Sequence, residues 1–393
     1  MRFSARTAWD VAESRLAQVL RERREKGLEV LDLTASNPTR CGFTCDAATI
    51  LEPLEDPAAL IYDPDPRGMR SSRQAVCNYY ANRGAEIQTE QVFLTTSTSE
   101  AYSWLFRLLC DAGDEVLIAL PSYPLFDFLA QIEDVRLVPY PLVYDHGWQM
   151  DFVGLRERIT PRTKAIAVVH PNNPTGHFTR AKERQELARI CAEEGLALIV
   201  DEVFLDYSFS SEESANVQSF AAGKHDCSTF VLSGISKIAA LPQMKAAWIC
   251  ACGPERELKD ALDRLEVVAD TFLSMNAPVQ CALPSWLEGF GPVQEEIRSR
   301  TQANLQNLDQ TLIRNPAITR LKVEAGWYAV LRVPAIGSDE ELAVRLVEER
   351  GVSVHPGNFF GFAGNGWLVM SLLGPEAEFR RGVEAICSEV QLR

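Results

Sequence analysis

A lysine with small and hydroxyl-bearing neighbours follows an apolar segment in the second half of the chain. Ser236 and Lys237 come shortly after the apolar run Thr229–Ser233, and Lys245 stands eight positions beyond the first lysine. A lysine amine attacks an aldehyde only when it is neutral, which requires partial burial or a neighbouring positive charge. The spacing therefore predicts a nucleophilic Lys237 between a strand and a helix, with Ser236 and Lys245 suited to binding a phosphate.

Two acidic residues stand at the end of another apolar run. Asp201 ends the run Ala197–Asp201, and Glu202 follows it directly. A buried carboxylate needs a cationic partner. A protonated pyridine nitrogen is one such partner, because a carboxylate that keeps it protonated lets the ring act as an electron sink. A metal site, a helix cap and a solvated strand end are the alternative interpretations.

The segment from His170 to Gly176 follows a third apolar run, Ala165–Val169. Its two prolines and its glycine end the strand in a rigid turn, and Asn172 and Asn173 can bond a ligand at the carboxyl end of a parallel sheet. Taken singly, this segment is also explained as a turn and Lys237 as a surface lysine. Three such loops in chain order, each after an apolar strand, favour one shared site instead.

These loops belong to a chain in which short aliphatic runs alternate with longer helical patterns. This alternation is typical of an α/β fold with a mostly parallel sheet covered on both faces. Helices are predicted at Ser99–Cys110, Thr179–Glu194 and Pro254–Val268, where apolar residues recur at helical spacing. The predicted strands are Val92–Thr95, Glu115–Leu120, Arg136–Tyr140, Lys164–His170, Ala197–Asp201, Thr229–Ser233 and Ala246–Cys250.

The pattern changes after about Ser285. A long polar helix is predicted at Val293–Arg314, and short strands follow at Arg320–Val323, Trp327–Val333 and Trp367–Ser371. An N-terminal helix at Ala8–Lys26 has no strand near it, and we expect it to pack on the same part. We therefore assign residues 46–284 to a large domain and residues 1–45 and 285–393 to a smaller α+β domain.

Composition restricts the class of partner. The 393 residues carry a net charge of −15, whereas nucleic acids and anionic membranes are bound by basic surfaces. No apolar stretch approaches the roughly 20 residues that cross a bilayer, and the N-terminus lacks the apolar run of a secretory signal. We expect a cytoplasmic protein that acts on small molecules and has no nucleic-acid or membrane partner. The cysteines lack zinc-ligand spacing, so no metal site is predicted.

Further motifs occur in a fixed order along the chain. They are Tyr62, Gly68 and the segment Arg70–Tyr80, then Thr95–Ala101, Gly113–Val116 and Pro121–Pro124, followed by the three loops described above. In this order the chain resembles the class I/II aminotransferases of the fold-type I pyridoxal-phosphate enzymes, across nearly its whole length. The resemblance implies a large domain with a mostly parallel seven-stranded sheet, a smaller α+β domain, pyridoxal 5'-phosphate as cofactor and a homodimer.

The resemblance also implies a role for individual residues. Lys237 would form the Schiff base and move protons, Asp201 would pair with the pyridine nitrogen, and Asn173 would bond the phenolic oxygen. Tyr123 would stack on the cofactor ring. The phosphate would be bound by hydroxyl, amine and helix-start N–H groups, with one tyrosine reaching it from a partner subunit: Ser97, Thr98, Ser99, Ser236, Lys245 and Tyr62.

Four positions depart from the family pattern. Phe204 replaces a tyrosine that donates to the phenolic oxygen, although the nearby Tyr207 could fill that gap. Gly234 and Lys245 replace a serine and an arginine. Val369 replaces the arginine that binds the substrate α-carboxylate, and a buried carboxylate without a charged partner is costly. The alternative carboxylate ligands are Arg40 and, beside it, Asn37; otherwise the substrate has no α-carboxylate.

The resemblance favours a transaminase that moves an amino group from an amino donor to a keto acid or another carbonyl acceptor. A lyase, a decarboxylase or a racemase is the first alternative, because this scaffold does not decide which substrate bond breaks. A non-catalytic binding or regulatory domain is the second. The presence of Lys237, Asp201 and Asn173 together argues against that second alternative.

Overall fold

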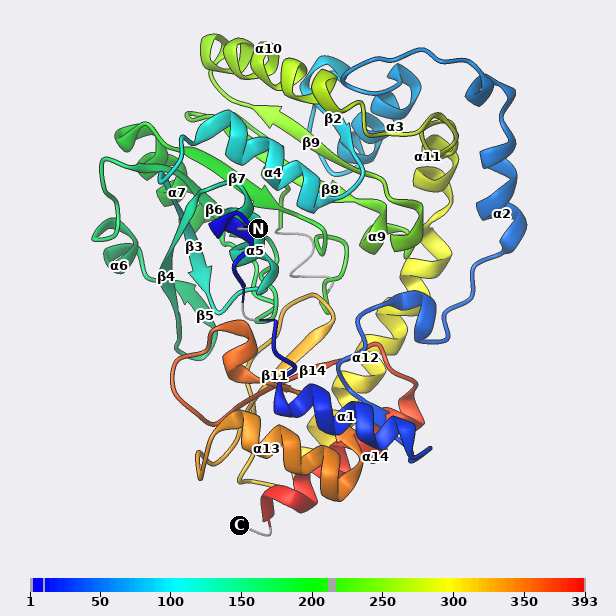
Figure 1. The fold of residues 1–393 in the computed structure, drawn as a ribbon, viewed down its shortest axis with the longest axis vertical. Coiled ribbons are helices and arrows are strands. Elements are labelled where there is room, and N and C mark those ends of the chain that lie inside the picture. The colour runs from blue at the N-terminus through cyan, green and yellow to red at the C-terminus, as the bar shows by residue number, and fades with distance from the viewer. Residues whose placement is uncertain (1–2, 10, 211–216, 392–393) are drawn as a thin grey trace.

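The computed structural model describes residues 3–9, 11–210 and 217–391. Its centre is an eight-stranded sheet that confirms the predicted α/β fold (Figure 1). In spatial order the strands are β2 (Val92–Thr95), β9 (Ala247–Cys252), β8 (Thr229–Gly234), β7 (Ala197–Asp201), β6 (Thr163–Val169), β3 (Glu115–Leu120), β4 (Arg136–Tyr144) and β5 (Trp148–Met150).

The five strands β8, β7, β6, β3 and β4 run parallel, and β9 lies antiparallel between β8 and β2. All seven predicted strands are present. The sequence prediction missed the eighth, β5, which pairs only with the end of β4 as a short hairpin. Its signal was the alternation of buried Trp148, exposed Gln149 and buried Met150. Because the parallel strands end at one edge, the loops after β3, β6, β7 and β8 meet there.

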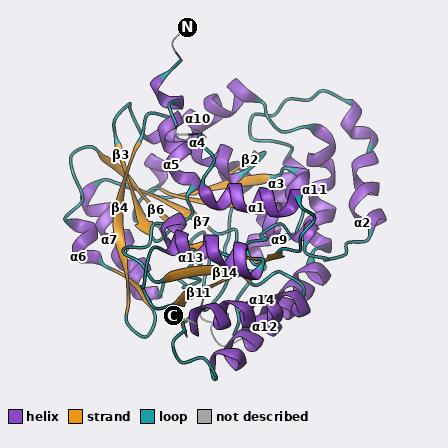
Figure 2. Ribbon diagram, turned by 60° about the horizontal axis from the view of Figure 1, so that its bottom comes forward, coloured by secondary structure: helices purple, strands orange, loops and turns teal. Residues whose placement is uncertain are grey.

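Helices cover both faces of this sheet, as Figure 2 shows. Strand β7 is buried along its whole length because its alternating side chains enter two different cores. One face packs on α4 (Thr98–Leu109), α5 (Leu125–Ile132) and α10 (Glu255–Phe272). The other face packs on α3 (Arg70–Ala81), α7 (Ala181–Glu194) and α11 (Ala277–Gly289), with the short helices α2 (Ala47–Leu51), α6 (Phe152–Arg156) and α9 (Ile235–Ile238) nearby.

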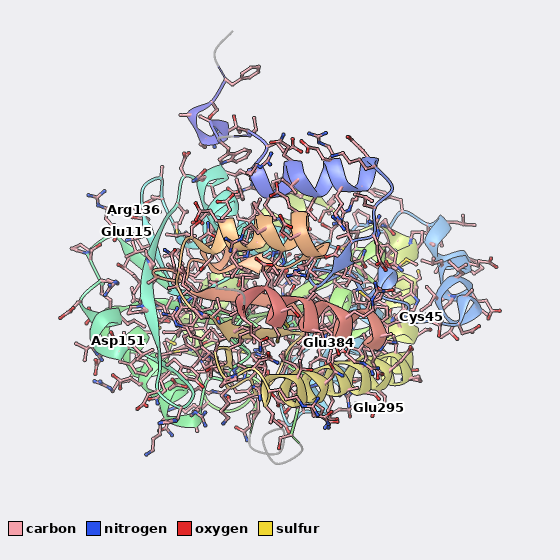
Figure 3. The ribbon with its side chains drawn as sticks, turned by 90° about the horizontal axis from the view of Figure 1, so that it is seen from below. Cys45, Glu115, Arg136, Asp151, Glu295 and Glu384 are labelled. Atoms are coloured by element: carbon pink, nitrogen blue, oxygen red, sulfur yellow. The ribbon has the colours of Figure 1, made fainter. Side chains whose placement is uncertain are left out.

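The C-terminal part forms a separate four-stranded antiparallel sheet in the order β10 (Thr319–Arg320), β11 (Tyr328–Arg332), β14 (Trp367–Ser371) and β13 (His355–Pro356). A third, two-stranded sheet joins β1 (Leu31–Asp32) to β12 (Val352–Ser353). The helices of this part are α1 (Arg15–Glu25), α12 (Gly291–Leu312), α13 (Asp339–Arg345) and α14 (Glu376–Gln391). Figure 3 shows these helices from below, with α1 against α13 and α14 against α12.

The N-terminal helix is shorter than predicted. It begins at Arg15 because the Ser14 side chain caps it by accepting the N–H of Ala17 at 3.2 Å. Residues before it contact the large domain instead, where the Trp9 ring lies 5.4 Å from the ring of Phe128 on α5. The predicted domain boundary between residues 284 and 285 falls inside α11. None of the helices among the described residues combines the length and the apolar character that a membrane-spanning helix needs.

Residues 323–325 of the C-terminal part lie directly against the loop after β6. The carbonyl oxygen of Gly176 accepts the N–H groups of Glu324 and Ala325 at 3.1 and 2.8 Å. The Glu324 carboxylate accepts the N–H of Phe178 at 3.0 Å and pairs with Arg180 at 2.6 Å. Gly176 has a φ of +68°, and a Cβ there would lie 2.3 Å from the oxygen of Ala325. Glycine is therefore required by both backbone conformation and space.

We predict that Gly176→Ala destabilises the protein more than Gly195→Ala does. Gly195 has nearly the same φ, +67°, but a Cβ at this position would meet no atom within 4 Å, so its variant isolates the cost of the left-handed backbone. Overlap with Ala325 should add about 1–3 kcal/mol to the loss caused by Gly176→Ala. Urea denaturation of both variants measures this difference, and equal losses would contradict the contact.

Candidate active site

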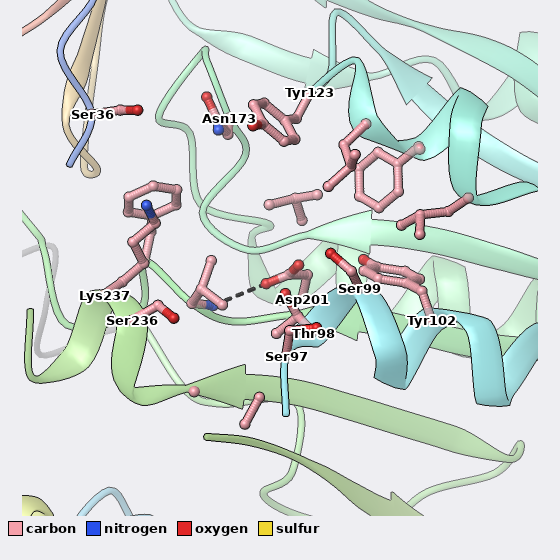
Figure 4. A pocket seen from close by; sticks show the side chains of 18 of the residues that line it. Ser36, Ser97, Thr98, Ser99, Tyr102, Tyr123, Asn173, Asp201, Ser236 and Lys237 are labelled. Carbon is pink, nitrogen blue, oxygen red and sulfur yellow. Dashed lines mark hydrogen bonds between the residues drawn. The ribbon is translucent and has the colours of Figure 1, made fainter. Parts of the chain in front are cut away.

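A cavity of about 230 Å³ lies at the carboxyl edge of the large sheet. Figure 4 shows Tyr123, Asn173 and Asp201 facing it, with Lys237 on the other side. Most of the residues for which the sequence predicted chemistry contribute to its wall. The lining is Ser36, Ser97, Thr98, Ser99, Tyr102, Tyr123, Leu125, Phe126, Leu129, Val169, Asn173, Asp201, Val203, Phe204, Gly234, Ser236, Lys237, Ala247 and Tyr328.

Lys237 lies in the short helix α9, directly after β8. The turn into this helix is tight, because a Cβ at Gly234 would lie 2.8 Å from the Cβ of Ala247 on β9. This lack of space explains why glycine replaces the serine of the family pattern. Burial lowers the pKa of Lys237 from 10.5 to about 8, and the negative charge of Asp201 opposes part of that fall. A substantial fraction of the amine is therefore neutral near pH 8.

Asp201 is the last residue of β7 and is only 7% exposed. One carboxylate oxygen accepts the N–H of Val203 at 3.1 Å, and the Asp201 carbonyl accepts the N–H of His170 from the neighbouring loop at 2.8 Å. Burial raises the pKa of Asp201 from 3.8 to about 6, although the Val203 N–H and the charge of Lys237 favour its ionised form. The site thus holds a buried carboxylate that a bound cation would stabilise further.

Asn173 lies in the loop after β6, and other polar side chains hold this loop in place. Asn172 donates to the carbonyl of Pro121 at 3.2 Å and to the hydroxyl of Thr175 at 2.8 Å. Nδ1 of His170 accepts the N–H of Thr179 at 3.0 Å, and burial lowers the pKa of this histidine to about 3, so it stays neutral. The Oδ1 of Asn173 is buried and has no hydrogen-bond partner within the described residues. An amide oxygen only accepts hydrogen bonds, so the Nδ2 group of the same side chain is the donor that a phenolic oxygen of a ligand would need.

Helix α4 begins at the opposite wall of the cavity. The Ser97 side chain caps it by accepting the N–H of Glu100 at 3.1 Å. Thr98 and Ser99 form its first turn and line the cavity. The first N–H groups of a helix lack partners within the helix and attract anions, so this end of α4 is suited to a phosphate.

Tyr123 precedes α5 in the cavity wall and is 41% exposed. Phe204 also lines the cavity and carries no hydroxyl. Tyr207, which the sequence offered as a substitute donor, does not fill this role. Its hydroxyl already donates to the backbone carbonyl of Lys237 at 2.6 Å, and this hydrogen bond uses its single proton.

Four predicted site residues lie outside the lining of this cavity. Lys245 and Arg40 are exposed, and Tyr62 is 83% exposed. The side-chain oxygen of Asn37 instead accepts the N–H of Thr39 at 3.1 Å, capping the short helical turn that follows. Their roles in binding the phosphate or the substrate stay predictions.

Other lining residues were not predicted. Ser36 and Tyr328 come from the N-terminal and C-terminal parts of the smaller domain, and α5 supplies the apolar side chains of Leu125, Phe126 and Leu129. The only sequence signal for α5 as a wall was its position after the Pro121–Pro124 loop. Tyr328 stands at the start of a strand, where its aromatic character indicated a core rather than a site.

The departure at Val369 leaves no charge at that position. Val369 is fully buried in β14, opposite Val330 of β11. Lys237 is the only lysine or arginine among the described residues that line the cavity. Within the same described part of the chain, no group of three or more histidine, cysteine or acidic side chains is arranged to hold a metal ion.

Comparison with known proteins agrees with this geometry. Residues 30–386 match the sequence pattern of the family described as aminotransferase class I and II. The chain belongs to this family. The glutamate-pyruvate aminotransferase AlaA of Escherichia coli is 26% identical over 86% of the present chain and 84% of its own. The arginine-pyruvate transaminase AruH of Pseudomonas aeruginosa is 28% identical over 94% and 91%.

The solved structure of an alanine aminotransferase from Pyrococcus furiosus has the same fold, with a TM-score of 0.88, 25% identity and full coverage of both chains. Enzymes of this family use pyridoxal phosphate, as the sequence analysis expected. The cavity fits that group. It offers a partly neutral lysine, a buried carboxylate for a pyridinium, an unpaired asparagine amide and a helix N-terminus for a phosphate.

We predict that Asp201→Asn stabilises the cofactor-free protein at pH 8. The folded-state pKa of about 6 lies above the ordinary 3.8, so the folded chain binds this proton more tightly than the unfolded chain does. Ionising Asp201 in the folded chain therefore costs folding free energy. This cost is absent below the unfolded pKa of 3.8, grows as the pH rises toward the folded pKa of about 6 and is complete above it. The variant should therefore gain about 3 kcal/mol at pH 8.

Urea denaturation at pH 5 and pH 8 tests this prediction, and the gain should be clearly smaller at pH 5. Asp145→Asn is the matched control, because the Asp145 side chain is 80% exposed and its replacement should change stability little at either pH. An Asp201→Asn variant that is no more stable than the wild type at pH 8 would contradict the assigned burial cost.

Proposed function

We propose that this aminotransferase transfers an amino group between an amino donor and a small 2-oxo acid, with Lys237 as the residue that binds the cofactor and moves the proton. The observation that carries the proposal is the convergence of Lys237, Asp201 and Asn173 on one cavity from the ends of three neighbouring strands. Each of these side chains also has the charge or hydrogen-bonding state that its proposed role requires.

When bound, pyridoxal phosphate supplies an electron sink for charge that develops at the substrate carbon. The Asp201 carboxylate would keep the pyridine nitrogen protonated, and the Nδ2 group of Asn173 would donate to the phenolic oxygen. The amine of Lys237 accepts the proton from the substrate carbon and returns it, which a pKa of about 8 permits near neutral pH. Thr98, Ser99 and Ser236, which line the cavity, would bind the phosphate, and Tyr123 would stack on the ring.

The first acceptor to test is pyruvate. The names of AlaA and AruH both include it, with glutamate or arginine as the other substrate. The two relatives are 26% and 28% identical to this chain, so their names serve to choose the first substrates to assay. The apolar wall formed by Leu125, Phe126 and Leu129 also favours a substrate without a second charged group at that side.

A second candidate is an amine donor that has no α-carboxylate. Val369 and Arg40 favour it, because the buried valine carries no charge and the exposed arginine does not line the cavity of one chain. A lyase, decarboxylase or racemase activity differs from both candidates, since it would not pass an amino group to an added oxo acid.

We also propose that the enzyme is a homodimer whose sites are shared. Leu60, Ile61 and Tyr62 are 89%, 67% and 83% exposed in the single chain, an unusual run of apolar surface. A twofold dimer is the commonest way to cover such a surface. In this arrangement Tyr62 would reach the cofactor phosphate bound by the partner subunit. A cytoplasmic location stays our expectation.

We predict that borohydride reduction of the purified holoenzyme labels Lys237 and that Lys237→Ala abolishes turnover. Lys237 is the only lysine that lines the described cavity, so peptide mapping should find the cofactor there.

The yellow protein should be bleached by an amino donor and its colour restored by pyruvate. A panel of amino acids and simple amines then separates the two donor classes. A label on Lys245 would refute the assignment of the lysine, and bleaching without recovery by any oxo acid would refute transamination.

We predict that Tyr62 acts in the site of the partner subunit. Co-expressed Tyr62→Ala and Lys237→Ala chains form mixed dimers in which one site has both wild-type residues only if Tyr62 acts across the interface. Random pairing then restores about a quarter of the wild-type number of sites. Each variant expressed alone is the control. Activity no greater than that of the Tyr62→Ala protein would show that the tyrosine acts within its own chain or not at all.

A further inference from the structure

Two aromatic rings, here called the aromatic pair, lie next to the amine of Lys237. The Nζ atom lies 5.0 Å from the ring centroid of Trp327 and 5.8 Å from that of Phe204. The two rings meet edge to face, with centroids 5.2 Å apart and planes at 78°. The amine is thus close to two aromatic rings that come from different parts of the chain.

Trp327 follows the segment 323–325 closely, and backbone hydrogen bonds on either side of it hold it in this position. The N–H of the preceding Gly326 donates to the carbonyl of Tyr207 at 2.8 Å, and the Trp327 carbonyl accepts the N–H of Leu372 at 2.7 Å. The indole ring is fully buried and packs edge to face on Tyr207 at 5.0 Å. Since the Tyr207 hydroxyl donates to the Lys237 carbonyl, one tyrosine fixes both the lysine backbone and the tryptophan ring.

The charges around the amine are few. Asp201, on β7, is the charged group that acts on Lys237, while Tyr207 contacts its backbone only. Phe204 has no hydroxyl that could bond the amine, and the indole nitrogen of Trp327 has no hydrogen-bond partner among the described residues. The aromatic pair therefore acts on the amine through its π-electrons, which attract a cation and not a neutral amine.

We propose that the aromatic pair binds the Lys237 ammonium whenever this lysine is not bonded to the cofactor, which makes Trp327 a positioning residue. The inference rests on the proposed role of Lys237. A lysine that moves a proton must exist in charged and neutral forms in the same place, and desolvation alone disfavours the charged form. A carboxylate in contact would hold the charge firmly, whereas aromatic faces stabilise it moderately and still allow the proton to leave.

The test measures the pKa of Lys237 in the cofactor-free, full-length chain. Trace labelling with acetic anhydride over a range of pH, followed by peptide mass spectrometry, reports how much of this one amine is neutral. We expect Trp327→Leu to lower the pKa of Lys237 by about one unit, because the ammonium loses one aromatic face. Trp327→Phe keeps a ring and should stay closer to the wild type. Phe204→Leu, at the longer distance, should lower this pKa by a smaller amount.

The control is Trp367→Leu. Its ring lies 4.2 Å from the guanidinium carbon of Arg332 in the smaller domain, so this variant also removes a cation–π contact but leaves the surroundings of Lys237 intact. It should not change the Lys237 titration. If Trp327 served only for packing, its replacement would admit water and the pKa of Lys237 would rise or stay the same. Either result in both Trp327→Leu and Phe204→Leu overturns the proposal.

These outcomes are separate from those of the borohydride experiment. A cofactor label on another lysine removes the assigned role of Lys237, whatever its titration shows. A label on Lys237, combined with a Lys237 pKa that neither Trp327→Leu nor Phe204→Leu lowers, leaves the transaminase intact and removes only the aromatic pair.

Discussion

The cost of removing charged groups from water governs the arrangement of this site. Lys237 and Asp201 are buried at the ends of neighbouring parallel strands. Burial lowers the pKa of Lys237 and raises the pKa of Asp201, so it favours the neutral form of each side chain. A pair held in this way costs folding free energy, so the surrounding fold must fix both side chains by other means. The tight turn at Gly234, the Val203 N–H and the hydrogen bond from Tyr207 to the Lys237 backbone supply that support.

Much of this fold could be predicted because periodicity and loop chemistry report on burial and on strand ends. The strand β7 is apolar on both faces since each face enters a separate core. The change from apolar residues to Asp201 and Glu202 marks its end in the sequence. The short β5 was missed because a three-residue hairpin strand carries little periodic signal. The predicted N-terminal helix was too long because Ser14 was not recognised as its cap, although a serine before a helical run is a typical start signal.

Site residues were predictable where a short local motif contains them, and less so where tertiary packing brings them in from distant segments. Asn173, Asp201 and Lys237 each stand at or soon after the end of a strand and line the cavity as expected. Trp327 belongs to a strand region of the smaller domain, and nothing in its local pattern indicates that it lies 5.0 Å from the amine. Arg40 is the converse case, since a suitable residue type at a suitable position in the chain is exposed outside the cavity. Long-range packing decides both cases, and a single sequence does not encode it in any short motif.

The contact at Gly176 limits how this sequence can diverge. Position 176 already has the smallest residue, and the space that a Cβ would fill is taken by the carbonyl of Ala325 and the side chain of Val323. No substitution at position 176 can therefore compensate for a backbone shift at 323–325. A substitution that moves the backbone at 323–325 is therefore tolerated only if the loop that carries Asn173 moves with it. The two segments, far apart in the chain, must change together or stay as they are.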